Sequence, residues 1–244
     1  MSSIINELRD DKNYYGSLGK SYLSNSDIGI LLTNPRAFRK EREETKAFAE
    51  GRLFHQLMLE PDKVKDFPLV DVSTRNTKEY KNYCDEHNLD FVMLKKEVDE
   101  IYHLAGVMKG NINFFIDIYS EGNLFEEPMV GEIKGMTWKG KADIVTKDCI
   151  IDLKTTSDIN KFKRSARLYH YDSQCYLYQQ LFGKPLVFYV IDKDTNQLGV
   201  FRPTEQFIKG GEAKVEKAIE IYKKYFSEDS TDEISNHYID ETLD

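Results

Sequence analysis

Residues 140–156 constrain this chain more than any other segment, because they read as two short apolar strands joined by a tight turn. The first strand carries Asp143, the second carries Asp152, and Lys154 follows two residues later. Side chains alternate between the two faces of a strand, so Asp152 and Lys154 point the same way. Two carboxylates at one sheet edge are costly unless a divalent cation neutralises them. The pattern indicates metal-dependent phosphodiester cleavage.

The spacing of apolar residues predicts an α/β core preceded by a helical N-terminal lobe. Residues 1–20 are polar and punctuated by glycine, which suggests a loose arm, and residues 62–90 show no clear pattern. The predicted order is helices over about 23–32, 47–59 and 93–119, the last broken near Gly110; strands over 124–133, 135–145 and 149–155; a long helix over 159–182; a hairpin of 186–192 and 198–202; and a helix over 205–226.

Charge is unevenly distributed and separates a body from a tail. The chain has a net charge of −8, but residues 227–244 hold seven of its 42 acidic residues and no Lys or Arg. The rest is close to neutral, which neither excludes nor favours a basic channel for nucleic acid. We therefore expect a single domain over residues 1–226 and an acidic, flexible tail over residues 227–244.

Composition is typical of a globular protein in a reducing compartment. Hydrophobic residues make up 40% of the 244 residues and charged residues 31%. The cysteines Cys84, Cys149 and Cys175 are scattered and lack metal-binding spacing. No apolar run approaches the length of a membrane span, and the N-terminus lacks a signal-peptide pattern. We expect a cytoplasmic location and no membrane partner.

Four short patterns occur in one order between residues 22 and 182. Asp143 lies nine residues before Asp152-Leu-Lys154, in an Asp…Asp-x-Lys arrangement, and Ala142 precedes it. The other patterns are Leu23-Ser-Asn-Ser26 with Asn34-Pro35-Arg-Ala-Phe38, Gly51 and His55 in a Gly-x-x-x-His helix, and Gln174 and Tyr178 in a Gln-x-x-x-Tyr helix. Together they resemble the PD-(D/E)XK nuclease superfamily and, within it, the RecE-like branch of phage-type exonucleases related to exonuclease VIII. The first pattern departs slightly, because many members have proline where Ala142 stands.

This resemblance implies a restriction-endonuclease-like core, in which helices flank a mixed central sheet, and a Mg²⁺ or Mn²⁺ site. Asp143, Asp152 and the backbone carbonyl of Leu153 would hold the ion, and His55 and Glu127 would complete the site or hold a second ion. Related iron–sulfur nucleases carry a cysteine just before the proline of the first helix and a later cysteine cluster. Since this chain has neither, no iron–sulfur cluster is expected.

The proposed roles compete with plainer readings of the same residues. Asp152 and Lys154 alone could be a surface ion pair, and His55 lies among apolar residues where a core histidine is common. Neighbouring strand positions face opposite ways, so one of Glu126 and Glu127 faces the site; we prefer Glu127 and keep Glu126 as the alternative. Gln174 fits an amide that faces the ligand, whereas core packing is enough to explain Tyr178, which stands one helical turn further on.

Several residues are candidates for contact with DNA. Arg164 and Arg167 open the predicted helix that follows the Asp152 strand, and Ser24 and Ser26 lie at the start of the first helix. Phosphate contact is the functional reading of all four, with Tyr178 as a further DNA contact. A solvated helix face is the plain reading of the arginines, and helix capping is the plain reading of the serines.

The resemblance implies a metal-dependent exonuclease that degrades one strand of linear double-stranded DNA, in the 5′→3′ direction, for recombination or repair in a bacterial or phage-infected cell. It also implies assembly into a ring-shaped trimer or tetramer and cooperation with a single-strand annealing protein. Two alternatives stay open. One is a structure-specific or restriction-type endonuclease of the same superfamily, and the other is a DNA-end-binding module without catalysis.

Overall fold

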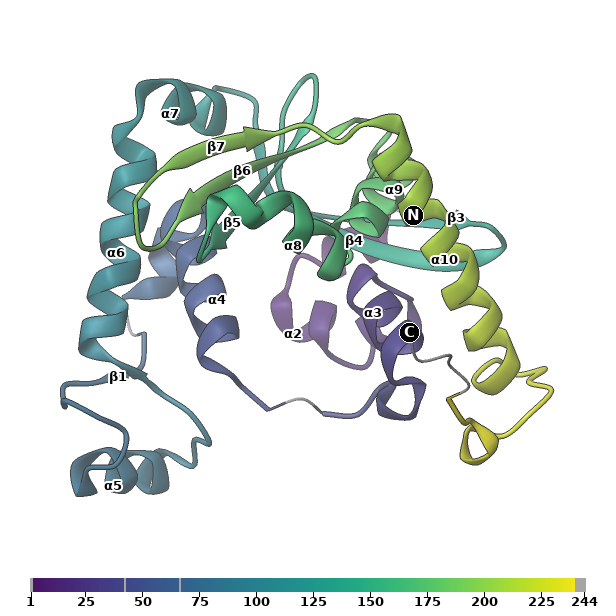
Figure 1. The fold of residues 1–244 in the computed structure, drawn as a ribbon, viewed down its shortest axis with the longest axis horizontal. Coiled ribbons are helices and arrows are strands. Elements are labelled where there is room, and N and C mark those ends of the chain that lie inside the picture. The colour runs from purple at the N-terminus through teal and green to yellow at the C-terminus, as the bar shows by residue number, and fades with distance from the viewer. Residues whose placement is uncertain (1, 42, 66, 240–244) are drawn as a thin grey trace.

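A five-stranded mixed sheet forms the centre of the molecule (Figure 1). The computed structural model describes residues 2–41, 43–65 and 67–239. Strands β5 and β6 run parallel, and all other neighbouring strands run antiparallel. The strands, in their order across the sheet, are β3 (Leu124–Ile133), β4 (Met136–Val145), β5 (Ile150–Thr156), β6 (Leu186–Asp192) and β7 (Leu198–Phe201).

Local turn chemistry explains the antiparallel half of the sheet. Lys134 and Gly135 join β3 to β4, and both have positive φ angles, which suit the turns of tight hairpins. The side-chain hydroxyl of Thr146 accepts hydrogen bonds from the backbone of Asp148 and Cys149, which closes the turn between β4 and β5. Parallel strands need a longer connection, and two helices link β5 to β6: α8 (Phe162–Leu168) and α9 (Tyr171–Phe182).

Side-chain alternation along the strands creates two cores, one on each face of the sheet. Ile150 faces a core formed with α9, with α3 (Asn25–Thr33) and with α10 (Glu205–Tyr225). Its neighbour Ile151 faces a second core formed with α4 (Lys46–Leu59), α6 (Lys95–Gly110) and α7 (Ile112–Tyr119). A sheet covered by helices on both faces confirms the predicted α/β class.

The remaining elements of the helical lobe lie beside the second core. Residues 62–90, which show no sequence pattern, contain the short strand β1 (Leu69–Val70) and the helix α5 (Lys78–His87). Strand β1 pairs in parallel with β2 (Met93–Leu94), and Tyr80 packs against this pair in a small core of its own. This part of the chain extends away from the central sheet in Figure 1.

The N-terminal arm is ordered, in contrast to the expectation of a loose segment. It forms α1 (Ser2–Glu7) and α2 (Asp11–Tyr15), and Leu8 and Tyr14 are buried against Val130 of β3. The amino groups of Lys139 and Lys141 on β4 contact the carbonyl of Tyr14 and the carboxylate of Asp11. The prediction failed because these contacts join residues more than 100 positions apart.

The predicted continuous helix over residues 159–182 is also wrong. The segment consists of a short 3-10 turn at Ile159–Lys161, then α8, then α9, and His170 between the two helices has a left-handed backbone with φ of 58°. Its carbonyl accepts hydrogen bonds from Asn25 Nδ2 and Ser173 Oγ. A contact with α3 therefore stabilises the break, and helical periodicity alone does not reveal it.

The acidic tail is attached to the body as far as the structure describes it. Arg36 donates hydrogen bonds to the carbonyls of Ser235 and His237, and the ring of His237 packs edge-on against Tyr225. The predicted flexible tail thus holds to the body through residue 237, and residues 240–244 lie outside the described residues.

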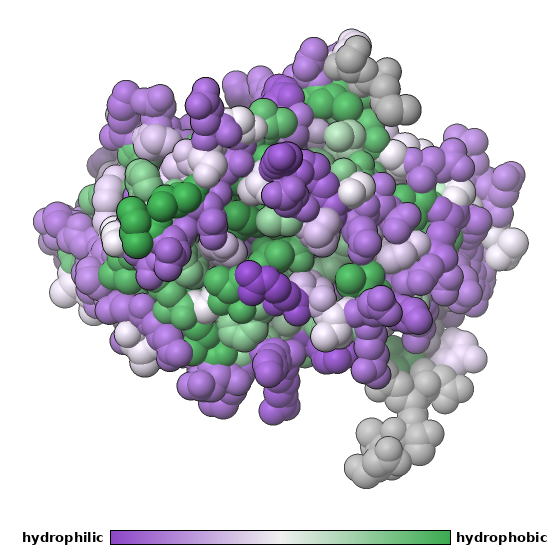
Figure 2. Space-filling model, turned by 90° about the horizontal axis from the view of Figure 1, so that it is seen from above, coloured by the Kyte–Doolittle hydropathy of each residue, from purple (hydrophilic) through white to green (hydrophobic). Residues whose placement is uncertain are grey.

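Polar side chains are prominent on the face of the molecule that Figure 2 shows. Figure 2 shows one face, on which hydrophilic side chains cover most of the surface and apolar atoms show between them in small patches. Among the residues that the structure describes, no helix is long and apolar enough to cross a membrane.

Candidate metal centre and active site

Three carboxylates lie in one row across β3, β4 and β5. The pairs Phe125–Ile144 and Glu127–Ala142 place Glu126 directly opposite Asp143. On the other side, continuing the β4–β5 register from Ile144–Ile151 places Asp143 opposite Asp152. Like charges directly opposite each other destabilise a sheet. The row therefore needs compensating positive charge.

Strands β4 and β5 separate at this row, whereas β3 and β4 remain paired on both sides of it. Asp143 Oδ2 accepts a hydrogen bond of 2.7 Å from the backbone N–H of Leu153, which replaces a ladder bond between β4 and β5. Only 7% of Asp143 and 1% of Asp152 are exposed to solvent. Both aspartates are thus oriented by the fold and largely removed from water.

Glu126, and not Glu127, faces the site, so the preferred acid of the sequence analysis is corrected. Glu126 has a left-handed backbone with φ of 49°, and its carboxylate lies within 4.8 Å of ligand atoms of His55 and Asp143. Glu127 turns away and receives hydrogen bonds of 2.5 and 2.6 Å from both terminal nitrogens of Arg9. This paired arrangement is a strong charge-assisted contact and occupies both oxygens of Glu127.

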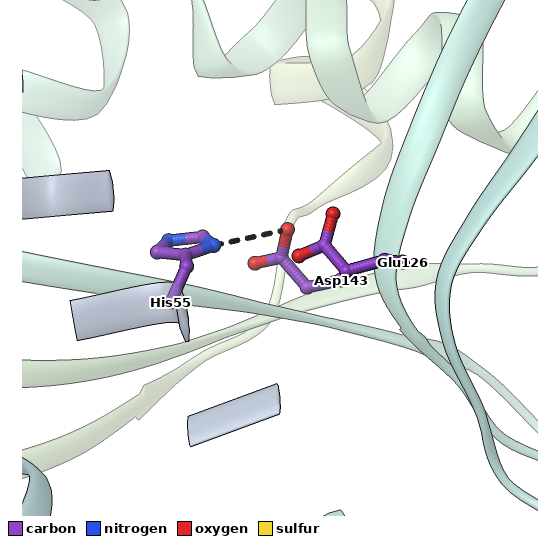
Figure 3. A group of neighbouring side chains, drawn as sticks. All are labelled: His55, Glu126 and Asp143. Carbon is purple, nitrogen blue, oxygen red and sulfur yellow. Dashed lines mark ion pairs between the residues drawn. The ribbon is translucent and has the colours of Figure 1, made fainter. Parts of the chain in front are cut away.

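Helix α4 places His55 next to Glu126 and Asp143 (Figure 3). Its Nδ1 lies 3.4 Å from Asp143 Oδ1, and its Nε2 donates a 2.9 Å hydrogen bond to the carbonyl of Leu153. His55 therefore contacts two of the groups that the resemblance implies as metal ligands. The plainer reading of His55 as a core residue does not fit, because its side chain keeps 27% of its exposure.

Asp152 is held by one amide and one ammonium. Gln174 of α9 donates a hydrogen bond of 2.6 Å from Nε2 to Asp152 Oδ1, and its contact with a ligand stays a prediction. Lys154 forms an ion pair with Asp152 Oδ2, so the two residues do share a face of β5. The ammonium of Lys154 also lies 5.0 Å from the centre of the Tyr171 ring, within cation–π range.

Burial and neighbouring charges raise the pKa values of three of these groups. Burial, reinforced by the carboxylate of Asp143, raises the pKa of Glu126 to about 8. Burial also raises the pKa of Asp152 to about 6, although Lys154 opposes the shift. For His55, burial would lower the pKa, but the carboxylate of Asp143 outweighs it and raises the pKa to about 9. Glu126 and His55 therefore retain protons at neutral pH, and strongly shifted pKa values of this kind are typical of functional sites.

The donor set suits a hard divalent cation. His55, Glu126 and Asp143 offer a nitrogen and two carboxylate oxygens close together, and Asp152 lies next to them in the row. Asp152 Oδ2 is buried and makes no hydrogen bond of normal geometry with any described residue, although Lys154 is near. Oxygen-rich ligands of this kind fit Mg²⁺ or Mn²⁺.

Among the residues predicted to contact DNA, Tyr178 and the two serines have structural roles of different kinds. Tyr178 is buried, and its hydroxyl donates a 2.9 Å hydrogen bond to the carbonyl of Lys141, so it supports β4 and does not reach DNA. Ser24 is the N-cap of α3 in a capping box with Asp27. The hydroxyl oxygen of Ser26 lies 3.0 Å from that of Ser24. The capping role of Ser24 is observed, and contact of both serines with phosphate stays a prediction.

The two arginines are available for contact with a ligand. Arg164 and Arg167 are both exposed on α8, which follows the active-site strand β5. The guanidinium of Arg167 stacks over the ring of Phe207 at 5.3 Å. Their predicted contact with DNA is untested.

Sequence reasoning missed two residues that shape the site. Tyr171 lies beneath the ammonium of Lys154. Arg9 binds Glu127 and belongs to the N-terminal arm, which the sequence predicts to be loose. Tyr171 begins the helix that carries the Gln-x-x-x-Tyr pattern, so a search of that helix for aromatic residues would have found it. No local signal identifies Arg9, because its partner is 118 residues away.

The fold and the carboxylate row define a core of the PD-(D/E)XK nuclease type. A family model described as a PDDEXK-like domain of unknown function (DUF3799) matches residues 33–237, and the chain belongs to this family. No curated protein matches the sequence.

A solved structure shows the same fold. The "Putative exonuclease" from Eubacterium rectale has a TM-score of 0.63 at 16% identity, with 96% of each chain covered. The match to a phage-related exonuclease from Haemophilus somnus covers 64% of this chain and 89% of that one, at 15% identity and a TM-score of 0.33.

Proposed function

We propose that this protein is a metal-dependent exodeoxyribonuclease that resects one strand of linear double-stranded DNA. The observation that carries the proposal is the convergence of Glu126, Asp143 and Asp152 with His55 and Lys154 at one edge of a PD-(D/E)XK core. Mg²⁺ or Mn²⁺ held by His55 and the carboxylates would supply an activated water and stabilise the charge that develops on the phosphate.

The protein's own residues would orient and neutralise the reacting groups. Lys154 holds a permanent positive charge beside Asp152, where it can orient a water or offset charge on the phosphate. Gln174 keeps the Asp152 carboxylate in one rotamer through its 2.6 Å hydrogen bond. Burial of the aspartates excludes water and strengthens each of these contacts.

The finer parts of the proposal rest on the resemblance of the four sequence patterns. They favour an exonuclease with 5′→3′ polarity that acts in phage-type recombination or repair in the cytoplasm. They also favour DNA ends as the partner, assembly as a ring trimer or tetramer, and transfer of single strands to an annealing protein. The endonuclease and the non-catalytic DNA-end-binding module are the competing functions.

The decisive experiment uses linear duplex DNA labelled at the 5′ end of one strand, with covalently closed circular DNA beside it. Purified protein is tested with Mg²⁺ or Mn²⁺, with EDTA, and as Lys154→Ala. We expect early release of labelled short nucleotides from linear DNA, and only with metal. Lys154→Ala should be inactive and fold normally by circular dichroism.

Each other result selects a different function. Cutting of the circle would replace the exonuclease by an endonuclease. Binding to DNA ends without cleavage under any metal would identify a DNA-end-binding module. Metal-dependent cleavage that survives in Lys154→Ala would contradict the active-site assignment.

A further inference from the structure

A second recess lies beside the active site, on the same face of the sheet. It has a volume of about 410 Å³ and lies between α8, the strands β6 and β7, and the start of α10. The rings of Phe162, Phe188, Phe201 and Phe207 line it. Phe162 and Phe188 are buried beneath it, whereas Phe201 and Phe207 are half-buried and offer ring surface. The ring of Phe162 supports that of Phe201, with the ring centres 4.6 Å apart.

The rim of this aromatic recess is positively charged. Lys163, Arg167 and Arg202 line it, and no Asp or Glu among the described residues does. All three are exposed, and none makes an ion pair with any residue in the described part of the chain. Unpaired cations around an aromatic floor complement a ligand that combines a flat ring with negative charge.

The register of the sheet connects the recess to the metal centre. Asp152 pairs with Phe188 on β6, and Phe188 pairs with Phe201 on β7. The row of carboxylates thus continues as two phenylalanines, and paired residues of neighbouring strands share a face. Two strand spacings separate Asp152 from Phe201, or about 10 Å, which equals about three base steps at the rise of duplex DNA.

Lys154 lies at the boundary between the two regions. Its ammonium is 6.0 Å from the centre of the Phe188 ring, which also forms part of the floor of the recess. A ligand in the recess is therefore separated from the cleavage centre by one side chain. This proximity favours the substrate strand itself as the occupant, in preference to an unrelated acidic peptide.

We propose that the aromatic recess binds an unpaired nucleotide of the substrate strand, with the base against Phe201 and Phe207 and the phosphates on Lys163, Arg167 and Arg202. The proposal rests on the proposed nuclease function, since it adds a single-strand subsite to that active site. Such a subsite holds the strand in position next to Lys154. Stacking of bases on aromatic side chains beside a basic groove is a general mode of single-strand binding.

The test measures binding separately from cleavage. Fluorescence anisotropy with a labelled oligodeoxythymidine of eight nucleotides, in EDTA, gives the Kd for wild type, Lys163→Glu and Arg202→Glu. We expect each variant to raise the Kd by at least about fivefold and to lower the salt slope by about 0.7 for each lost phosphate contact. The matched control is Lys217→Glu, which changes charge equally on an exposed position of α10 outside the recess and should leave the Kd within about twofold.

Two competitors identify the chemistry of the ligand. Pyrophosphate and hexaglutamate should displace the oligonucleotide far less well than unlabelled oligodeoxythymidine does. Displacement by pyrophosphate at the same phosphate concentration would overturn the nucleotide assignment in favour of an anion site, and displacement by hexaglutamate would overturn it in favour of an acidic peptide site. Unchanged Kd values in both Lys163→Glu and Arg202→Glu would overturn the proposal directly.

A small substrate keeps this proposal distinguishable from the nuclease function. Hydrolysis of bis(p-nitrophenyl) phosphate with Mn²⁺ reports on the metal centre without filling the recess, and Lys163→Glu should retain it. If wild type hydrolyses neither this substrate nor DNA, the proposed nuclease function fails, and the oligonucleotide binding still decides for or against the recess.

Discussion

Glu126 lies directly opposite Asp143 across the antiparallel pair β3–β4, and both carboxylates approach His55. Two acids in this position repel each other in the absence of a cation. The left-handed backbone of Glu126 turns its side chain into the site, while the next residue, Glu127, is bound by Arg9 on the other side of the strand. Two adjacent residues of β3 thus have different roles: Glu126 is a candidate metal ligand, and Glu127 forms a structural ion pair with Arg9.

Exchange of one acid for its amide should separate these two roles. We expect Glu126→Gln to lower metal-dependent DNA cleavage by about 100-fold or more, because it removes a candidate ligand. Glu127→Gln should keep most activity and lower the free energy of unfolding by about 1 kcal/mol, since Arg9 is half exposed. Initial cleavage rates and urea denaturation of both variants measure this. The opposite ranking of activities would return Glu127 to the site.

Metal affinity should rise with pH. In the metal-free protein, burial and Asp143 raise the pKa of Glu126 to about 8, and Asp143 outweighs burial to raise the pKa of His55 to about 9. Both groups bear protons at neutral pH and must release them to bind a cation. The affinity should therefore increase by up to about 100-fold per pH unit below pH 8 and level off above about pH 9.

Calorimetric titration with Mn²⁺ at pH 6.5, 7.5 and 8.5 measures this dependence. Glu126→Gln should reduce the slope, because one fewer proton is released. An affinity independent of pH would mean that these two residues do not bind the ion.

Gln174 should act through Asp152. Its amide donates the 2.6 Å hydrogen bond to Asp152 Oδ1, and Gln174→Met preserves volume while removing the donor. We expect kcat to fall about 10- to 100-fold, in line with the loss of a residue that orients a metal ligand. Gln180→Met, at an exposed position of the same helix, is the control and should leave kcat unchanged. Equal effects of the two variants would show that the helix, and not the hydrogen bond, was affected.

The N-terminal arm should contribute to stability through Asp11. Its carboxylate lies 2.7 Å from the ammonium of Lys141, which is buried on β4, and 2.5 Å from that of Lys63. Asp11→Asn leaves a buried ammonium without its counter-charge and should cost about 1–3 kcal/mol in urea denaturation. Asp62→Asn is the matched change at an exposed pair with Lys65 and should cost less than about 0.5 kcal/mol. Comparable losses in both variants would argue against a special role of the arm.

The strands of the core were predictable because their signals are local. The bounds of β3 and β6 agree with the predicted 124–133 and 186–192, since alternation and turn residues are contained in each short segment. The same holds for Asp152 and Lys154, whose common face follows from strand geometry alone and is confirmed by their ion pair.

The errors have a common physical origin in contacts between distant residues. The choice between Glu126 and Glu127 depended on a left-handed backbone stabilised by Arg9 and the site, and the break in the helix after β5 depended on the contact of His170 with Asn25. Sequence periodicity carries no information about either contact.

The sequence by itself determined the class of fold, the strands that carry the acids, and the identities of Asp143, Asp152, Lys154, His55 and Gln174 as candidates. The fold class, the strands and the positions of Asp143, Asp152 and Lys154 depend on local spacing, which is a property of short segments, whereas His55 and Gln174 are candidates because of the resemblance to the nuclease superfamily. Only the tertiary structure decided that Glu126 faces the site, that the arm of residues 2–15 is part of the body, and that the carboxylate row continues into an aromatic recess. Each of these depends on the register and packing of segments far apart in the chain, because side chains that converge in space are oriented by partners that no local pattern specifies.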